Sequence, residues 1–475
     1  MSGGNSQALT AALGAVVGEQ DCVTGPGTER YLVDHRALYR GAALAVVTPR
    51  SVGAVSRVLA FCNERRIGVV PQGGNTSYCG GAVPDESGRQ VVLSLERLNR
   101  IRSVEASDYS LIAEAGCLLV EVQRAAEAAE RFFPLSLGSE GSCQIGGNLS
   151  TNAGGTNVLR YGMARDQVLG LEVVLADGRV LSSLPGLRKD NTGYDLDDLF
   201  LGAEGTLGII TAASLKLLPL PRAVATAFIA VRDVAAAVAL LARLRDATGD
   251  RVTSFELVPR LAVELTVKHI PGVVDPLEAP HDWYVLCELA SPRAAEPLDE
   301  FLEEALAGAL ESGLVLDAAL ARNAHQGTAF WRLRESIPEA QRRDGASLKH
   351  DISLPVSRLA EFVARASIWL GAQFQEGRLI AYGHVGDGNL HFNLNQAPGA
   401  SRERFLAREA DVRRTIHDLV HDFGGSFSAE HGIGRLKVDE LERYASQPKL
   451  ALMHLLKAAL DPQGILNPGK VLHSA

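Results

Sequence analysis

Closely spaced cysteine pairs are absent from this chain. No two of its cysteines have a C-x-x-C spacing; they are Cys22, Cys62, Cys79, Cys117, Cys143 and Cys287. Most of them stand in apolar or glycine-rich stretches, which suits packed thiols better than a disulfide framework or a redox motif. We therefore expect the protein to belong to a reducing compartment.

A surplus of positive charge is also lacking. The chain has 47 basic and 56 acidic residues, which gives a net charge of -9. Like charges nowhere form a run of about five or more, the length that marks an interaction tail. A polyphosphate partner needs clustered Lys and Arg. The composition therefore predicts no nucleic-acid partner.

A long apolar run is missing as well. Residues 1–7 carry no basic cluster, and the apolar stretch 8–17 is short and interrupted by Thr10 and Gly14. A secretory signal has a basic start before its apolar core, and a membrane-spanning helix needs about eighteen or more consecutive apolar residues. We therefore expect no secretion, no membrane span and a cytoplasmic localisation.

The patterns that are present predict an α+β fold class. The chain has 475 residues, of which 46% are hydrophobic, and at about 150 residues per domain this length suits about three folding units. In the first part, a helix over 51–66 with Ser51 as its cap leads to a strand over 67–70. Further strands are expected over 91–95, 111–115, 171–175 and 207–218.

The pattern changes after Leu220 and Pro221. Glycine becomes rarer, and strands over 226–231, 252–257 and 283–289 alternate with helices over 234–244 and 297–310. This order predicts an antiparallel sheet backed by helices on one face. From about residue 400 the chain becomes mostly helical. We therefore divide it into residues 1–220, 221–400 and 401–475.

Two glycine-rich segments, 71–77 and 137–155, carry small hydroxyl and amide residues. Consecutive backbone N–H groups in such loops can form a nest for a pyrophosphate, because no Cβ obstructs them. Neither segment has the G-x-G-x-x-G of a Rossmann turn or the G-x-x-x-x-G-K-[ST] of a P-loop. A Gly-Gly pair taken alone is more often a tight turn, and it is the presence of two such loops that favours a ligand site.

The order of these two loops, followed by residues 160–162 and 202–211, resembles the FAD-binding domain of the vanillyl-alcohol oxidase and p-cresol methylhydroxylase superfamily, over most of residues 35–220. The resemblance implies a two-lobed FAD-binding domain in residues 1–220. Its first loop would hold the pyrophosphate, and its second would pass along the flavin. The implied cofactor contacts are Pro71, Gly73, Gly74, Asn75, Thr76, Gly138, Ser139, Gly146, Gly147, Asn148, Asn152, Gly155, Tyr161, Glu204, Ile210 and Asn467. Asn75 stands where covalent members place a histidine, so we expect non-covalent FAD.

A second constellation combines His384 and His391 with Glu430 and His431. Residues seven apart face opposite sides of a straight strand, so the two histidines converge only if the chain turns at 386–388 (Gly-Asp-Gly). Two imidazoles and a carboxylate suit Zn²⁺ or a similar divalent ion with open positions. Packed or surface histidines remain the alternative, and so does a metal-dependent hydrolase that uses the same set to activate water.

Together with residues 466–470 (LNPGK), these motifs resemble the D-2-hydroxyacid dehydrogenases, and the resemblance then covers nearly the whole chain. It implies that His384, His391 and Glu430 hold the metal and that His431 is the catalytic base, with a structural histidine as the alternative. Such an enzyme passes the C2 hydride of a D-2-hydroxy acid to flavin N5 while a base takes the hydroxyl proton. Residues 221–400 would form the substrate domain, and residues 401–475 would complete the active site.

The segment 331–353 resembles the D-2-hydroxyglutarate branch of this family. It implies that Arg334 and Lys349 bind the two carboxylates of a diacid, with Asn393 as a further substrate contact; solvated surface groups are the alternative. Pro338 stands where some members have a hydroxyl residue, which leaves D-malate, D-lactate and glycolate open as substrates. The reaction we expect is the oxidation of D-2-hydroxyglutarate to 2-oxoglutarate.

The chain lacks a Rossmann fingerprint, so NAD is disfavoured as the electron acceptor. An electron-transferring flavoprotein or a quinone is expected instead, and the chain is expected to form a homodimer. A non-enzymatic alternative is a flavin-bearing subunit of a larger redox complex.

Overall fold

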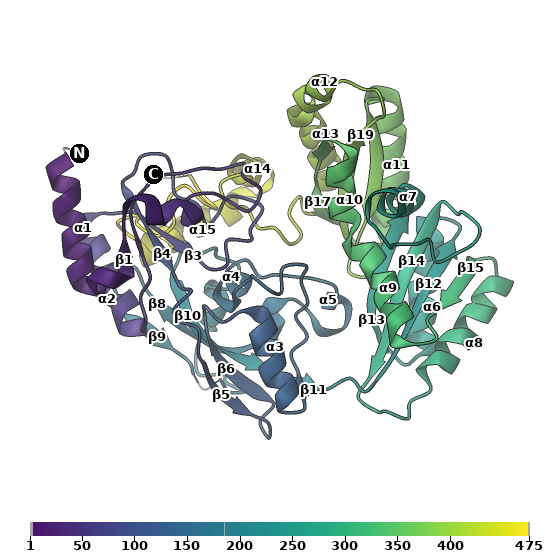
Figure 1. The fold of residues 1–475 in the computed structure, drawn as a ribbon, viewed down its shortest axis with the longest axis horizontal. Coiled ribbons are helices and arrows are strands. Elements are labelled where there is room, and N and C mark those ends of the chain that lie inside the picture. The colour runs from purple at the N-terminus through teal and green to yellow at the C-terminus, as the bar shows by residue number, and fades with distance from the viewer. Residues whose placement is uncertain (1–2, 185, 474–475) are drawn as a thin grey trace. The chain divides into compact units, whose positions relative to one another are not determined.

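The structure of the chain is a computed structural model that describes residues 3–184 and 186–473. It consists of two compact units. Unit 1 comprises the residues up to Gly154, Met163–Leu220 and the residues from Glu430 onward, and unit 2 comprises Gly155–Gly162 and Pro221–Ala429. Figure 1 shows their elements.

Unit 1 contains a sheet in the order β1-β2-β4-β3, formed by Cys22–Val23, Ala43–Val47, Gln90–Ser94 and Val69–Gln72. The last three strands are parallel, so the chain must cross over between them, and helix α2 (Val52–Arg65) makes the crossover from β2 to β3. Ser51 caps this helix as predicted, since its hydroxyl accepts the N–H of Ala54 at 3.3 Å. Helix α1 (Gly3–Val17) packs beside α2.

A second sheet of unit 1 has the order β5-β6-β10-β8-β9 and is antiparallel throughout. Its strands are Ile101–Glu105, Ser110–Glu114, Ile209–Lys216, Val168–Val174 and Val180–Ser182. Its apolar side chains share a core with helices α3 (Leu119–Ala128) and α4 (Ile145–Ser150). A short pair joins β7 (Arg131–Phe132) to β11 (Leu218–Pro219).

The C-terminal segment belongs to unit 1. Helices α14 (Val438–Tyr444) and α15 (Gln447–Leu460), yellow in Figure 1, are followed by a parallel bridge between Leu466 and Val69 of β3. Ile465 and Leu466 are buried in the same core as α2 and β3.

Unit 2 contains an antiparallel sheet in the order β13-β14-β12-β15, formed by Val252–Pro259, Trp283–Ser291, Ala223–Val231 and Val315–Leu320. Helices α6 (Val234–Ala247) and α8 (Leu298–Glu311) share one core with this sheet. The opposite face packs on α7 (Arg260–His269), α9 (Ala324–Glu335) and α10 (Ile337–Asp344). The prediction of helices on one face is therefore wrong. Strand β13 is buried along its whole length, so both of its faces need cover.

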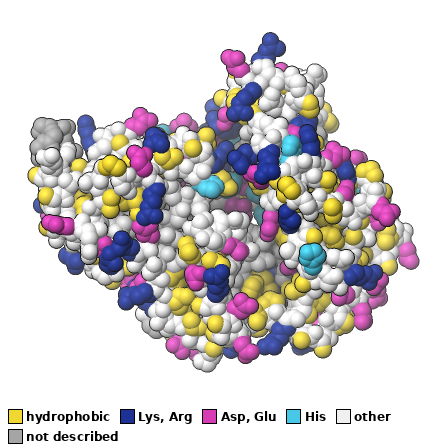
Figure 2. All heavy atoms as spheres, in the orientation of Figure 1, with side chains coloured by type: hydrophobic (Ala, Val, Ile, Leu, Met, Phe, Trp, Pro, Cys, Tyr) yellow, Lys and Arg dark blue, Asp and Glu magenta, His cyan; other side chains and the backbone are white. Residues whose placement is uncertain are grey.

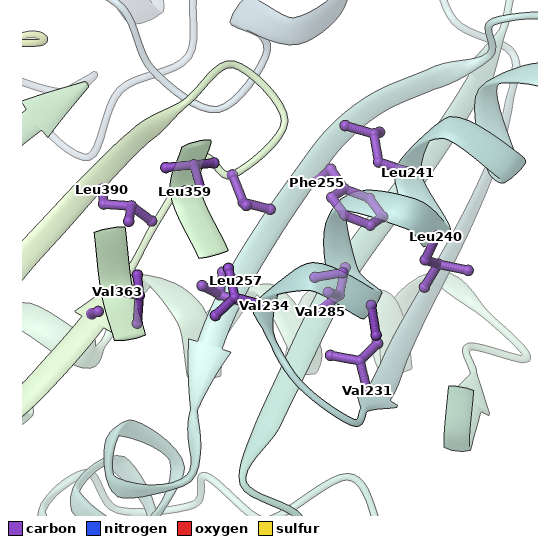
Figure 3. Packing of buried hydrophobic residues seen from close by; sticks show 14 of the residues in the cluster. Val231, Val234, Leu240, Leu241, Phe255, Leu257, Val285, Leu359, Val363 and Leu390 are labelled. Carbon is purple, nitrogen blue, oxygen red and sulfur yellow. The ribbon is translucent and has the colours of Figure 1, made fainter. Parts of the chain in front are cut away.

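A second sheet of unit 2 is centred on β19 (Asn389–Gln396), which pairs with β16 (Ser347–Leu348), β17 (Asp351–Ser353) and β18 (Gly377–Tyr382). Helices α11 (Leu359–Gln373), α12 (Arg402–Ala407) and α13 (Glu409–Asp422) pack against it. Its core is continuous with that of the first sheet, and Figure 3 shows members of the cluster, among them Val231, Val234, Leu240, Leu241, Phe255, Leu257, Val285, Leu359, Val363 and Leu390. The short helix α5 (Val158–Tyr161) also packs on β13.

The change of unit at Leu220 and Pro221 coincides with the boundary expected from the sequence. The later division lies between Ala429 and Glu430 and not near residue 400. The reason is packing, because Phe405 and Val412 are buried in the core of unit 2. Helical content changes at 400, but the apolar faces of α12 and α13 decide where these helices belong.

None of the described helices is long and apolar enough to cross a membrane. On the face drawn in Figure 2, acidic and basic side chains are interspersed.

Candidate active site

The turn expected between His384 and His391 is present in unit 2. Strands β18 and β19 form an antiparallel pair in which Tyr382 lies opposite His391. His384 stands in the connecting segment, and its ring centroid lies 5.6 Å from that of His391. Gly388 has a φ of +89°, and a Cβ there would lie 2.1 Å from the carbonyl oxygen of Leu354. Glycine at this turn therefore allows the two imidazoles to converge.

A carboxylate that the sequence analysis did not single out lies beside this pair. Leu257 and Gly383 exchange two backbone hydrogen bonds of 2.8 and 3.0 Å, which join β13 to the end of β18. This bridge places Glu256 next to His384, and the Oε1 of Glu256 lies 2.6 Å from the Nδ1 of His384. Glu256 is 1% exposed.

Arg334 reaches the same carboxylate from helix α9. Its Nε and Nη2 lie 2.8 and 2.7 Å from the Oε2 of Glu256. Burial by itself raises the pKa of Glu256, but the opposing charges and hydrogen bonds of His384 and Arg334 outweigh it and lower the pKa to about 2. Glu256 is thus a buried anion held between two partners.

Arg334 is not the solvated surface cation that was the alternative to a substrate contact. Its side chain is buried and its guanidinium lies 4.8 Å from the centroid of the Tyr382 ring. The bonds to Glu256 occupy the Nε and Nη2 edge, and within the described residues Nη1 makes no hydrogen bond. Only that second edge is left for a ligand.

The other two predicted substrate contacts, Lys349 and Asn393, belong to the second sheet of unit 2. Lys349 is exposed and stands between β16 and β17. Asn393 is 2% exposed, accepts the backbone N–H of His350 at 3.2 Å and donates to the Oε1 of Gln341 at 3.1 Å. Each end of this amide has a partner in the protein, so Asn393 is not the surface amide of the alternative.

Glu430 and His431 are the first residues of the chain after it returns to unit 1. The ring of His431 packs edge-on against Tyr78, with centroids 4.7 Å apart. The next residues are held by Glu204, whose carboxylate accepts the N–H groups of Ile433 at 2.7 Å and Gly434 at 2.8 Å. The predicted flavin contact Glu204 therefore also anchors the segment that carries the predicted base.

The two glycine-rich loops of unit 1 lie against each other. A Cβ on Gly74 would lie 2.1 Å from the carbonyl oxygen of Ser142, so the backbones touch and only glycine fits. By contrast, nothing lies within 4 Å of the Cβ position of Gly138 or Gly147. Asn75 adopts a left-handed φ of +53°. Backbone contact on one side and open space on the other suit a nest that faces a ligand.

Buried polar atoms at these loops support the same interpretation. Within the described residues, the Oε1 of Gln144 and the Oδ1 of Asn467 are buried and have no hydrogen-bond partner. The Nδ2 of Asn467 donates to the carbonyl oxygens of Gly81 and Glu204. Buried acceptors without a donor are rare in native proteins. The loops therefore fit a bound group that supplies donors, as a nucleotide with hydroxyl and amino groups does.

The remaining predicted cofactor contacts divide between the units. Gly155 and Tyr161 belong to unit 2, and the others belong to unit 1. Asn148 and Asn152 have protein partners, since Asn148 Nδ2 donates to Cys143 Sγ at 3.6 Å and Asn152 Oδ1 accepts the N–H of Arg165 at 3.0 Å. Ile210 is buried in β10, and Gly146 packs on Ala115 without room for a Cβ. These four positions build the loop and the sheet beneath it, whatever they contact in a ligand.

Two protein families match the chain, and the later match begins near the change of unit at Leu220 and Pro221. Residues 43–183 match the family "FAD binding domain", and residues 220–471 match "FAD linked oxidases, C-terminal domain". The probable mitochondrial D-2-hydroxyglutarate dehydrogenase of Oryza sativa subsp. indica is 40% identical over 93% of this chain and 77% of its own length. The mitochondrial D-2-hydroxyglutarate dehydrogenase of Rattus norvegicus is 41% identical over 93% of this chain and 80% of its own.

The fold matches that of p-cresol methylhydroxylase with substrate bound, with a TM-score of 0.78 and 18% identity over 100% of this chain and 98% of that one. At this identity the likeness shows the fold alone. It confirms the α+β architecture of the vanillyl-alcohol oxidase and p-cresol methylhydroxylase type.

The relatives correct the expected localisation. Those from rice, Arabidopsis thaliana, Danio rerio and Rattus norvegicus are named mitochondrial, which contradicts the cytoplasmic prediction. That prediction relied on a missing secretory signal and a missing membrane span, and neither feature bears on import into an organelle. The resemblance drawn from the motifs, however, is confirmed over most of the chain. The chain belongs to the D-2-hydroxyglutarate dehydrogenase family of FAD-linked oxidases.

Proposed function

We propose that this chain oxidises D-2-hydroxyglutarate to 2-oxoglutarate with non-covalently bound FAD and a divalent metal ion such as Zn²⁺. The observation that carries the proposal is the buried arginine beside the two histidines of unit 2, in a chain about 40% identical to D-2-hydroxyglutarate dehydrogenases. A diacid needs a cation for its distal carboxylate as well as a site for its hydroxyl end.

His384, His391 and Glu430 are the residues proposed to hold the metal. Two imidazoles and one carboxylate are a donor set that Zn²⁺ accepts, and the ion would lower the pKa of a substrate hydroxyl. Glu430 follows, a few residues later in the chain, a segment that is fixed to unit 2. Ser426 exchanges backbone hydrogen bonds of 2.8 and 2.9 Å with Ser353 at the end of β17. The four residues that follow Ser426, up to Glu430, span at most about 14 Å, and β17 lies beside His391 on β19.

The other groups have separate tasks in this proposal. His431 takes the hydroxyl proton, since an imidazole titrates near neutrality. The Nη1 edge of Arg334 and the ammonium of Lys349 bind carboxylates, while the glycine loops of unit 1 bind the nucleotide. FAD supplies the hydride acceptor, N5 of its ring. An electron-transferring flavoprotein or a quinone is proposed as the next acceptor, and a homodimer as the assembly.

Anaerobic mixing of the purified protein with a panel of D- and L-2-hydroxy acids tests this function. D-2-hydroxyglutarate is expected to bleach the flavin absorbance fastest, D-malate, D-lactate and glycolate more slowly, and the L-enantiomers not measurably. Faster bleaching by D-lactate or glycolate would assign the enzyme to a monoacid. No bleaching by any of them would favour the flavin-bearing subunit.

A further inference from the structure

Five side chains of unit 2, the two histidines among them, contact one another in a closed ring. Glu256 contacts both His384 and Arg334. Arg334 lies over the Tyr382 ring, whose centroid is 4.9 Å from that of His391. His391 completes the ring of contacts with His384. The members come from β13, α9, β18, β19 and the β18–β19 connection, so several elements fix the arrangement.

In this ring of contacts, each carboxylate oxygen of Glu256 has a different partner. Its Oε1 faces the Nδ1 of His384, and its Oε2 faces the guanidinium of Arg334. A buried carboxylate is tolerated only when such partners compensate its lost hydration. The backbone bridge between Leu257 and Gly383 leaves little freedom in its position. Displacing either partner therefore disturbs the other.

The contact with Oε1 orients the ring of His384. A carboxylate accepts hydrogen bonds, so Nδ1 is the nitrogen that donates to Glu256, and Nε2 is the nitrogen left to bind a metal ion. Histidine ligands of metals commonly have such a partner, which orients the ring and makes it a better donor. His384 is thus presented as an Nε2 ligand.

The contact with Oε2 sets the orientation of Arg334. Binding through Nε and Nη2 fixes the plane of the guanidinium, and stacking on Tyr382 fixes its face. The Nη1 edge then has one direction in which to donate. A guanidinium held in this way loses less conformational entropy when it binds a carboxylate.

We infer that Glu256 is a positioning residue that couples the metal site to the site for the distal carboxylate of the substrate. This inference rests on the proposed function, in which His384 binds metal and Arg334 binds the diacid. The affinity for the metal then depends on Arg334, which is not a ligand, and the affinity for the diacid depends on Glu256, which repels it. Such a coupling is reciprocal, so a diacid also tightens metal binding.

The first test is Glu256→Gln in the full-length protein loaded with FAD. A glutamine amide has one acceptor end and one donor end, so it can satisfy His384 or Arg334 but not both. Competition with a chromogenic chelator measures the dissociation constant for Zn²⁺. We expect it to rise roughly 10-fold to 100-fold, the effect usual for a lost partner of a ligating histidine, with FAD content unchanged.

Glu288→Gln is the matched control. Glu288 is a half-buried carboxylate on the same face of this sheet, because it pairs with Ser254 two residues before Glu256. Its partner is the indole N–H of Trp331, at 2.7 Å, and not a histidine. Zinc affinity in this variant is expected to match that of the unchanged protein. An equal loss in both variants would indicate general damage to the sheet and overturn the inference.

Arg334→Met is the second variant, and it keeps the test decisive if Glu256→Gln fails to fold. Arg334 is a substrate residue in the proposal, so without coupling its loss leaves zinc affinity unchanged. With coupling, zinc affinity falls even when no diacid is present. Unaltered zinc affinity in Arg334→Met overturns the inference while leaving the proposed function standing. A failure of the unchanged protein to bind zinc would reject the proposed metal site and the inference with it.

Discussion

The carboxylate of Glu204 accepts the backbone N–H of Gly434 at 2.8 Å, although 230 residues separate the two in the chain. The same carboxylate accepts the N–H of Ile433. Replacing it with glutamine leaves one of these buried N–H groups facing another donor. We expect Glu204→Gln to lower the free energy of unfolding by about 1 to 3 kcal/mol, the cost of one unsatisfied buried group.

The pH dependence of this loss has a definite sign. Burial raises the pKa of Glu204 above 4.5, and the hydrogen bonds from Ile433 and Gly434 offset only part of the rise. A raised carboxyl pKa means that the folded state binds its proton more tightly, so this stabilisation is full below about 4.5. It is lost as the pH rises through the folded pKa. Urea unfolding from pH 4 to 8 should therefore show the unchanged protein losing stability relative to Glu204→Gln as the pH rises. If the free energy of unfolding of the unchanged protein instead exceeds that of Glu204→Gln by more at higher pH, the prediction is wrong.

The attachment of FAD gives a second prediction. Asn75 donates its amide to the carbonyl oxygen of Val33 at 2.8 Å and has no nucleophilic atom to offer the flavin. Acid precipitation should leave the yellow colour in the supernatant. Colour that stays with the precipitated protein would refute non-covalent binding.

Removal of the metal gives a third prediction. Prolonged chelation should abolish reduction of the flavin by D-2-hydroxyglutarate while the flavin stays bound, since the glycine loops contain none of the proposed metal ligands. Absorbance spectra before and after chelation, and after Zn²⁺ is restored, make the measurement. Full activity without metal would exclude the metal from the reaction.

His431→Ala should slow flavin reduction by roughly 10²-fold to 10⁴-fold, the contribution of a general base. Zinc content should remain unchanged, because His431 is not one of the proposed ligands. His473→Ala is the control, since His473 is a surface histidine paired with Asp439 at 2.9 Å. Equal rates in both variants would make His431 structural.

Arg334→Ala should lower kcat/KM for D-2-hydroxyglutarate. The loss of transition-state stabilisation should be about 2 to 5 kcal/mol, because a buried carboxylate of the substrate loses its cation. D-lactate lacks the distal carboxylate and should suffer less. The structure adds that D-lactate will not be untouched, since Glu256 loses its partner as well. The ratio of the two efficiencies is the measurement, and equal losses would remove Arg334 from diacid recognition.

The convergence of the two histidines could be predicted from the sequence because its cause is local. Residues 386–388 (Gly-Asp-Gly) predict a turn between His384 and His391, and Ser51 before an apolar pattern predicts the start of a helix. Both features depend on neighbours within a few positions. The matching loops of unit 1 were likewise recognised from their own residues.

Glu256 could not be found in the same way. It lies in an ordinary strand pattern, and its partners are 128 and 78 residues away in the chain. Only the bridge between Leu257 and Gly383 shows that this strand ends beside a histidine. The environment of Arg334 was missed for the same reason, since an exposed and a paired arginine look alike in a helix pattern.

The pairing of Val69 with Leu466 has a consequence for the order in which the protein can form during synthesis. Chains emerge from the ribosome N-terminus first, at about 5 to 20 residues per second. The long segment of unit 2, from Pro221 to Ala429, can form both of its sheets once it has emerged. Unit 1 begins earlier but needs the last residues to cover β3, and the ammonium of Lys457 joins the carbonyl oxygens of Thr206 and Leu466 at 2.8 Å each. The half of the protein that is made first is therefore the half that is finished last.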